Sequence, residues 1–340
     1  MLWRQPTELL LASAGSYPRI GESPDQQRHR QAFARHERGE ISREAFEAVQ
    51  DAVTEEVVRE QIEAGLDIVT DGQIRWYDPI SHFVRSLESV QIDGLLRFFD
   101  TNCYFRQPVV RARLGWKEPI LLRDFKFARG ISAKPVKVVL TGPYSLARGS
   151  LLETDVYRGI GDLTRAYAEI LAQEIRALAD EGAALVQLDE PAILAHPEDL
   201  GLLREALDLL RGVMGKAKLA LFVYFGDAAP LYRELQQLPI DVLGLDFTYS
   251  ATLPSVIAEA GTAKILSLGL FDGRNTRIER REEIFSLLDR ILPHVTSSVV
   301  YLTPSSGLEY LPRERARAKL EAMKAIRDAY QAERPKLRAR

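Results

Sequence analysis

The feature that most constrains this fold is a repeated alternation of short apolar runs with longer amphipathic segments. The runs are rich in Val, Ile and Leu and are mostly continuous, as expected of strands covered on both faces of a sheet. Alternation of this kind is typical of strand–helix units built around a parallel sheet. Eight runs occur, at residues 8–14, 67–70, 137–140, 185–188, 219–224, 242–245, 265–268 and 299–303.

Helical segments follow most of these runs and carry residue types that begin and end helices. Ser42 is a favourable N-cap for one of them, and Gly65 and Gly182 are natural stops. Eight strands with a helix after most of them predict an α/β fold of the (β/α)8 barrel type. An open doubly wound sheet is the alternative. The predicted helices are 42–64, 162–181, 197–214, 230–238, 254–260, 277–292 and 312–333.

One segment is too long to be a simple crossover. Residues 79–130 follow the second run and contain the stretch 95–110, which has the pattern of an extended hairpin. We predict a single barrel domain over residues 1–340, in which 79–130 is an insertion or lid at the C-terminal face. Aromatic residues gather in and before this insertion. Core packing and a stacking platform for a flat ligand are both open interpretations of them.

Composition excludes several classes of protein. The chain has 340 residues, 46% of them hydrophobic, and a net charge of −3 from 45 basic and 48 acidic residues. These values are typical of a globular protein, and they give no electrostatic reason to expect nucleic acid or an anionic membrane as partner. No stretch approaches the roughly 20 apolar residues of a membrane helix. We therefore predict small-molecule substrates, and we leave a protein partner unspecified.

The cysteine content and the N-terminal residues bear on location. Cys103 is the only cysteine, so neither an internal disulfide nor a multi-cysteine metal site is possible. The apolar run 9–12 is too short for a typical signal peptide, and we interpret it as a buried strand. These observations favour a cytoplasmic protein.

Charged residues stand where the predicted strands end, which is where barrel enzymes carry their chemistry. Carboxylates at the mouth of an apolar barrel are costly to desolvate unless they are paired. Their convergence predicts a polar ligand with a cationic group, whereas helix N-caps and loop salt bridges are the alternative. The carboxylates are Asp71, Asp189, Glu190 and Asp246, and the bases that could close the ring are Arg19 and Arg274.

Other catalytic patterns are missing from the sequence. It contains no Gly-x-x-x-x-Gly-Lys phosphate loop and no Gly-x-Ser-x-Gly nucleophile elbow. None of the five histidines ends a predicted strand. A zinc site needs three or four converging ligands, so the residues by themselves predict no metal centre.

Seven short motifs, in this order and spacing, resemble the cobalamin-independent methionine synthase family over residues 12–311. They are GSYPRIG at 15–21, DGQ at 71–73, FDTNCY at 99–104, LTGP at 140–143, DEPA at 189–192, GLFDGRN at 269–275 and PSSGL at 304–308. The resemblance implies a barrel fold and the transfer of a methyl group from a methylated folate to homocysteine. The motifs at 99–104 and 272–275 look more like the non-catalytic N-terminal barrel of the two-barrel members.

The resemblance also implies that the family's zinc site is lost. The His and the first Cys of that site fall on Phe222 and Tyr224, its Glu falls on Asp246, and its last Cys falls on Ser306. Zinc activates a thiol by deprotonating it, and a free thiol with a pKa near 8.5 is mostly protonated at neutral pH. Ordinary transfer from folate to homocysteine would lack this help.

The leading hypothesis is a zinc-free methyltransferase that acts on homocysteine or a similar small acceptor. Asp189, kept from the family pattern, would hold the substrate amine, and Asp189, Asp246 and Tyr224 form the predicted catalytic set. The predicted substrate-binding set is Ser16, Arg19, Asp71, Gln73, Asp100, Asn102, Arg106, Glu190, Arg274 and Ser306. Gln73 replaces an acidic residue of the family. A folate-type methyl donor is possible, and no cofactor is assigned.

Two other functions stay open. The first is a non-catalytic barrel that binds folate or a partner protein, as in the N-terminal half of the two-barrel enzymes. The second is a decarboxylase of the uroporphyrinogen type, which would need a basic mouth for several carboxylates. The acidic strand ends disfavour it.

Overall fold

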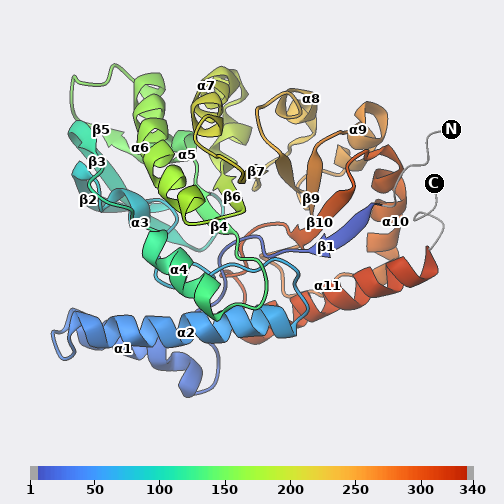
Figure 1. Cartoon of the computed structure of the whole chain (residues 1–340), viewed down its shortest axis with the longest axis horizontal. Coiled ribbons are helices and arrows are strands. Elements are labelled where there is room, and N and C mark those ends of the chain that lie inside the picture. Colours follow the sequence, from blue (N-terminus) through green and yellow to red (C-terminus); the bar gives the residue numbers. More distant parts are fainter. Residues whose placement is uncertain (1–6, 335–340) are drawn as a thin grey trace. The chain divides into compact units, whose positions relative to one another are not determined.

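A computed structural model describes residues 7–334, and these residues form the alternating strands and helices that the sequence predicts (Figure 1). Seven of the eight predicted runs contain a strand. The remaining run, 67–70, contributes single parallel bridges at Ile68 and Val69. The strands of these runs are β1 (Glu8–Leu11), β4 (Val138–Thr141), β6 (Leu185–Asp189), β7 (Lys218–Val223), β8 (Val242–Asp246), β9 (Ile265–Phe271) and β10 (Val299–Pro304).

The chain divides into two compact units, which are described separately. The first comprises the described residues of Met1–Arg75, Phe127–Val136 and Pro254–Arg340, and the second comprises Trp76–Lys126 and Lys137–Leu253. A single domain over residues 1–340 therefore stays a prediction, and its first six and last six residues lie outside the described part.

The first unit contains parallel strands with long helices. β1 pairs with β10, and β10 pairs with β9. Ala12 bridges to Ile68, and Val69 bridges to Val136, so the parallel arrangement continues beyond β1. The helices of this unit are α1 (Arg28–Glu37), α2 (Arg43–Glu63), α10 (Arg281–Ile291) and α11 (Arg313–Glu333).

The second unit has a parallel sheet in the order β4, β6, β7, β8. Its helices are α3 (Ser81–Val84), α5 (Pro143–Gly149), α6 (Ile160–Asp180), α7 (Leu200–Arg211) and α8 (Tyr232–Leu235). α4 (Leu122–Ile131) and α9 (Leu253–Ala260) run across the boundaries between the units in sequence.

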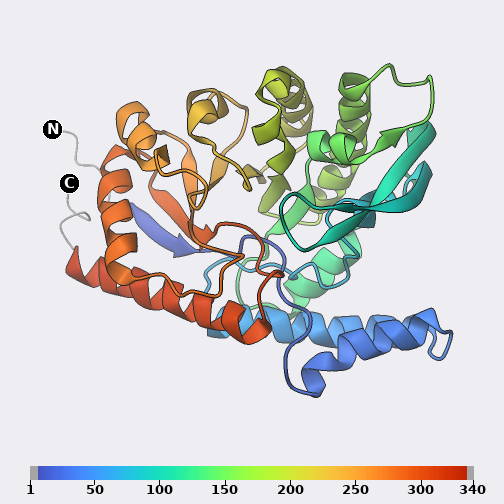
Figure 2. The same cartoon turned by 180° about the vertical axis from the view of Figure 1, so that it is seen from behind.

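The insertion forms the predicted hairpin. β2 (Glu88–Arg97) and β3 (Tyr104–Gly115) pair antiparallel, and the short β5 (Leu151–Leu152) adds to β3 in parallel. Figure 2 shows this hairpin in teal. The end of the hairpin that carries its turn packs Phe98 and Phe105 against Ile80, with Phe99 and Phe225 beside them. Core packing therefore accounts for most of these aromatic side chains.

The helix ends follow the chemistry read from the sequence. Ser42 caps α2, because its side chain accepts a hydrogen bond from the backbone N–H of Ala45 at 3.2 Å. Gly65 and Gly182 follow α2 and α6 with φ of +91° and +94°, a conformation that favours glycine. α1, α4 and the short α3 and α5 are helices that the sequence analysis did not predict.

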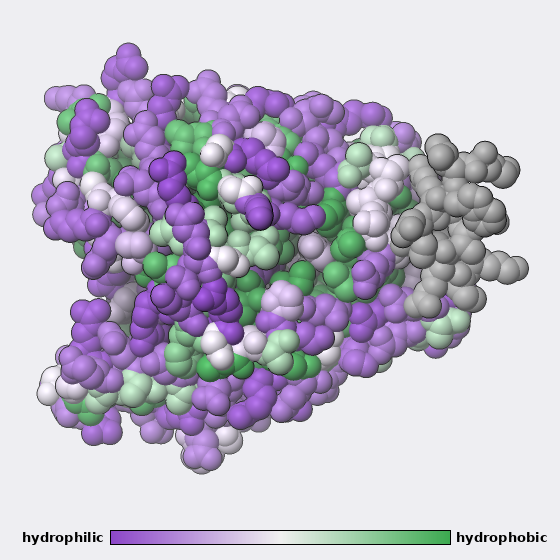
Figure 3. Space-filling model, in the orientation of Figure 1, coloured by the Kyte–Doolittle hydropathy of each residue, from purple (hydrophilic) through white to green (hydrophobic). Residues whose placement is uncertain are grey.

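The distribution of hydrophilic residues on the surface is that expected of a globular protein. On the face shown in Figure 3, hydrophilic residues dominate and hydrophobic residues occupy limited areas between them. Among residues 7–334, no helix has both the length and the apolar character needed to cross a membrane.

Candidate active site

The predicted catalytic residues of the second unit stand at the carboxyl ends of neighbouring parallel strands. Asp189 ends β6, Tyr224 directly follows β7, and Asp246 ends β8. Asp189 is in register with Phe222, and Phe222 is in register with Gly244. Pairing of the strands therefore brings together side chains that are up to 57 positions apart in sequence.

Asp189 is held by two hydrogen bonds. Its Oδ1 accepts from the Gln187 side-chain amide at 2.6 Å, and its Oδ2 accepts from the Tyr224 hydroxyl at 3.1 Å. The carboxylate remains half-buried at the end of its strand. Such a group can bind a cationic ligand, because part of its surface is open while its orientation is fixed by its neighbours.

A buried lysine completes this arrangement. Lys137 is only 2% exposed, and its ammonium donates a hydrogen bond to Oε1 of Gln187. The same Nζ lies 4.7 Å from the centre of the Phe222 ring. Burial lowers the pKa of Lys137 to about 7, and the Asp189 carboxylate opposes this shift.

The Glu190 side chain points to the start of α5, away from the groups that hold Asp189. Its fully buried carboxylate accepts hydrogen bonds from the backbone N–H of Tyr144 at 2.9 Å and of Ser145 at 2.7 Å, and from the Ser145 hydroxyl at 2.6 Å. A Cβ at Gly142 would collide with this carboxylate, so a glycine is required there. Glu190 thus fixes the turn into α5, and contact with a substrate stays a prediction.

Glu190 should make stability depend on pH. Burial raises its pKa from 4.5 to about 7, so between these values the folded protein keeps a proton that the unfolded chain releases. Its stabilising contribution is complete below pH 4.5 and is lost as the pH rises through 7. Relative to the Glu190→Gln variant, the free energy of unfolding of wild type should fall by on the order of 3 kcal/mol as the pH rises from 4.5 to 7.

Urea unfolding of both proteins at pH 4.5, 6 and 8 measures this difference. The Gln variant cannot titrate at this position, so it isolates the contribution of Glu190 from those of other groups. A stability difference that is constant with pH would show that Glu190 ionises normally.

Asp246 ties two loops of the second unit together. Its Oδ1 accepts from the backbone N–H and the hydroxyl of Thr248, at 2.8 and 2.6 Å, and its Oδ2 accepts from the backbone N–H of Phe225 at 3.3 Å. The side chain is buried. These bonds fix the chain directly after Tyr224, and a catalytic role for Asp246 stays a prediction.

The hairpin residues of the predicted set differ in their surroundings. Oδ2 of Asp100 accepts a hydrogen bond from the hydroxyl of Tyr249, in the loop after β8, at 2.9 Å. Asn102 and Arg106 are exposed, and the backbone N–H of Arg106 donates to Asp78 at 3.1 Å. Within the second unit, the hairpin tip therefore reaches the carboxyl ends of β7 and β8, as expected of the insertion.

The first unit gathers another part of the predicted set. The carbonyl of Ser16 accepts from the backbone N–H of Leu308 at 2.8 Å, and a Cβ at Gly307 would collide with the Ser16 hydroxyl. The loops after β1 and β10 thus bring Ser16 and Ser306 near each other. Arg19 lies 3.8 Å from Glu309, which forms a partly exposed ion pair.

The loop after the second predicted run lies beside Ser16. The backbone N–H of Tyr17 donates to the carbonyl of Gly72 at 3.0 Å, and Oδ1 of Asp71 accepts from the backbone N–H of Gln73 at 3.0 Å. Desolvation raises the pKa of Asp71 above its usual value. Gln73 has a φ of +53°, which is uncommon for a residue other than glycine.

A buried ion pair fixes the loop after β9, which carries Arg274. Lys319, on α11, donates to both oxygens of Glu279 at 2.8 and 3.0 Å and to the carbonyl of Arg277 at 2.7 Å. Oε1 of Glu279 in turn accepts from the backbone N–H of Asp272 at 2.8 Å. This Lys319–Glu279 clasp holds both ends of the loop.

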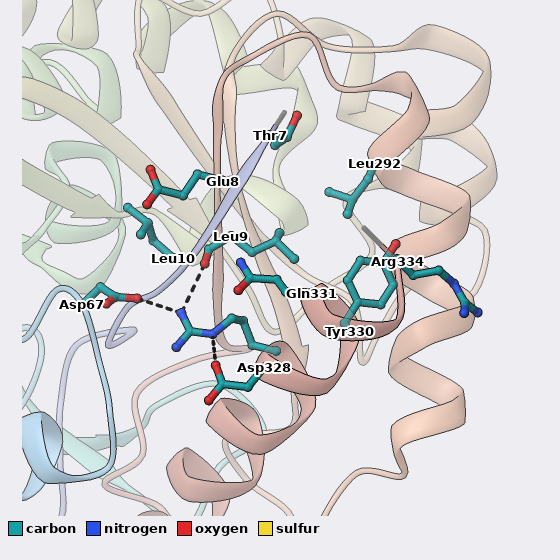
Figure 4. Close-up of a pocket in the computed structure, with 11 residues that line it drawn as sticks. Thr7, Glu8, Leu9, Leu10, Asp67, Leu292, Asp328, Tyr330, Gln331 and Arg334 are labelled. Atoms are coloured by element: carbon teal, nitrogen blue, oxygen red, sulfur yellow. Dashed lines mark hydrogen bonds and ion pairs between the residues drawn. The ribbon is translucent and has the colours of Figure 1, made fainter. Parts of the chain in front are cut away.

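One hollow of the first unit lies away from these residues. It has a volume of about 620 Å³ beside β1, where Arg327 bonds to Asp67, Asp328 and the carbonyl of Leu9. Figure 4 shows Leu9, Asp67 and Asp328 at this hollow. None of the predicted site residues lines it. It is bounded by Thr7 and Arg334, the first and last described residues, and we assign it no ligand.

Comparison with known proteins decides the family. A family model described as "Cobalamin-independent synthase, Catalytic domain" matches residues 12–329. The chain belongs to this family. A methionine synthase of Saccharolobus solfataricus is 31% identical over 310 residues, which cover 89% of this chain and 91% of the relative. One of Sulfolobus acidocaldarius is 31% identical over 304 residues, with 88% of each chain covered.

Solved structures share the fold. A B12-independent methionine synthase from Shewanella sp. W3-18-1, in complex with selenomethionine, superposes with a TM-score of 0.76 at 22% identity and covers 97% of this chain and 98% of its own. A putative vitamin-B12-independent methionine synthase from Listeria monocytogenes gives 0.71 at 17% identity, with 95% and 99% covered. The predicted (β/α)8 barrel class with an insertion after the second strand is confirmed.

The residues at the family's zinc positions do not fit that metal. Phe222 has no ligand atom, and the hydroxyl of Tyr224 donates its hydrogen bond to Asp189. Asp246 already accepts hydrogen bonds from two loops of its own unit, and the hydroxyl of Ser306 is not among the side-chain groups that zinc usually takes as ligands. Within residues 7–334, His, Cys, Asp and Glu side chains form no group of three or more that could hold a metal ion.

Sequence reasoning missed Lys137 and Gln187. Both lie in predicted apolar runs, and a Lys and a Gln inside such runs are signals of a buried polar contact. The predicted residues of the cobalamin-independent synthase site fall into two groups, with Asp71 in the first unit and Asp189, Glu190 and Asp246 in the second. The single ring of carboxylates stays a prediction.

Proposed function

We propose that this chain is a methyltransferase of the methionine synthase type that works without the family's zinc. The acceptor is homocysteine or a similar small amino acid, and the donor is a folate or another methylated molecule. The observation that supports this most is Asp189, which is retained at the end of β6 and is held by Gln187 and Tyr224. On the neighbouring strand, Phe222 and the following Tyr224 stand at two positions where the family has zinc ligands.

In this proposal, Asp189 binds the amino group of the acceptor. An ammonium group donates strong, charge-assisted hydrogen bonds to a carboxylate. The Tyr224 hydroxyl keeps one oxygen oriented, and Asp246 keeps the backbone after Tyr224 in place. The other members of the predicted substrate-binding set keep their predicted roles: Ser16, Arg19, Asp71, Gln73, Asp100, Asn102, Arg106, Glu190, Arg274 and Ser306.

The chemistry requires a reactive methyl donor. In the transfer, the acceptor sulfur forms a bond to the methyl carbon, the bond from that carbon to the donor breaks, and the thiol proton is lost to solvent or to the departing donor. A thiol with an ordinary pKa is only a few per cent thiolate at pH 7. Transfer from a neutral folate amine is therefore expected to be slow, and transfer from a sulfonium donor is expected to be faster.

A methyl-transfer assay tests the proposal. Purified protein is incubated with homocysteine and either a methylated folate or a sulfonium donor, with and without a chelator, and methionine is measured. We expect methionine to form at a rate that the chelator does not change, and metal analysis to find no stoichiometric zinc. Stoichiometric zinc together with activity lost to the chelator would contradict the proposal.

The replaced zinc positions also favour a second function. A barrel without thiol activation could bind a folate or a partner protein without catalysis. Calorimetric binding of a folate, with no turnover of any donor and acceptor pair, would support this alternative.

A further inference from the structure

The second unit contains a buried chain of side chains from Lys137 through Gln187 to Asp189. Lys137 and Gln187 are both almost inaccessible to solvent, whereas Asp189 is half-buried at the strand end. The strand register brings these side chains together. Val139 of β4 pairs with Gln187 of β6, and Lys137 lies two residues before Val139. Asp189 lies two residues further along β6 and therefore faces the same side as Gln187.

The donors and acceptors allow one orientation of the Gln187 amide. An ammonium group only donates hydrogen bonds, so the oxygen of the Gln187 amide must face Lys137. The NH2 group must then face Asp189, to which it donates at 2.6 Å. If the amide were turned over, its oxygen would face the Asp189 carboxylate and its NH2 group would face an ammonium.

Burying an ammonium group costs free energy because the group loses its hydration, so a buried lysine is expected only where its charge makes compensating contacts. Burial lowers the pKa of Lys137 to about 7, which reflects this cost. The Phe222 ring, at 4.7 Å, and the Asp189 carboxylate both favour the charged form. An apolar side chain of similar length would fill the same space more cheaply if packing were the only requirement.

We propose that Lys137 is a positioning residue for Asp189: it fixes the Gln187 amide so that the Asp189 carboxylate stays oriented as an acceptor for the ammonium group of the substrate. This inference rests on the proposed function, because it assumes that Asp189 receives an amine. Lys137 acts through Gln187 and does not touch the substrate.

The variants are chosen to separate this role from packing. Lys137→Met removes the donor and keeps the length, and Lys137→Arg keeps the charge. The double variant Lys137→Met with Gln187→Leu replaces both polar partners by apolar groups, which is the substitution most tolerated in a core. Lys126→Met, an exposed lysine of the same unit that pairs with Glu181, is the control.

The first measurement is binding of L-homocysteine by calorimetry, beside its KM and kcat. We expect Lys137→Met and the double variant to weaken binding at least tenfold, with a smaller effect on kcat, and Lys137→Arg to recover part of the loss. Lys126→Met should bind as wild type does. In an Asp189→Asn background, Lys137→Met should have little further effect, because the two residues act as one unit.

The second measurement needs no ligand. In ¹⁵N-labelled protein, the side-chain amide of Gln187, assigned by its loss in Gln187→Leu, should be protected from exchange in wild type and in Lys137→Arg. It should lose that protection in Lys137→Met. Unchanged protection and unchanged homocysteine affinity in Lys137→Met would overturn the inference. If wild type binds no homocysteine but the amide responds as expected, only the proposed function fails.

Discussion

Replacing Asp189 by Asn is expected to weaken binding of homocysteine by roughly thirtyfold or more, because removing one charge of a desolvated ion pair costs about 2–5 kcal/mol. The Asn side chain keeps the size of Asp189, and its carbonyl oxygen can still accept from the Gln187 amide, but it carries no charge to attract an ammonium group. Calorimetry gives the change in Kd, and kcat/KM of the methyl transfer should fall in parallel.

Two controls make this result specific to the amine. Asp155→Asn removes an exposed carboxylate of the same unit and should leave binding unchanged. 4-Mercaptobutanoate, which is homocysteine without its amino group, should bind wild type and Asp189→Asn equally weakly. Equal affinity of both proteins for homocysteine would show that Asp189 does not hold the amine.

Replacing Lys319 by Met is expected to cost about 3–5 kcal/mol of the free energy of unfolding, which is typical when one partner of a buried ion pair is removed. The Lys319 side chain is 0% exposed and that of Glu279 is 7% exposed, so the carboxylate left behind would be buried without its cation. Urea unfolding at neutral pH measures the loss.

The matched control lies on the same helix. Lys324 pairs with Asp328 on α11, but its side chain is 46% exposed, so Lys324→Met should change stability by less than about 1 kcal/mol. Because Glu279 also accepts from the backbone of Asp272, Lys319→Met should loosen the loop that carries Arg274. Equal losses in the two variants would show that burial of the Lys319–Glu279 clasp adds nothing.

Local patterns in the sequence were sufficient to predict most of the strands and helices. The continuous apolar runs predicted seven strands, and their predicted ends differ from the observed ends by at most a few residues. The capping residues Ser42, Gly65 and Gly182 predicted where two long helices begin or end. The run at 67–70 formed only isolated bridges. Asp189, Tyr224 and Asp246 could be placed at strand ends in advance, because a strand's end is visible wherever its apolar run stops.

The sequence by itself determined the order of strands and helices and the residues at the strand ends, and the loss of the zinc site stays a prediction. Only the tertiary structure decided which buried polar groups meet. Glu190 follows Asp189 directly but turns to α5, because successive side chains of a strand point to opposite sides. Lys137 reaches Gln187 across 50 positions because the register of β4 and β6 aligns them. Hydrogen bonds over such separations depend on strand pairing, which local residue patterns do not encode.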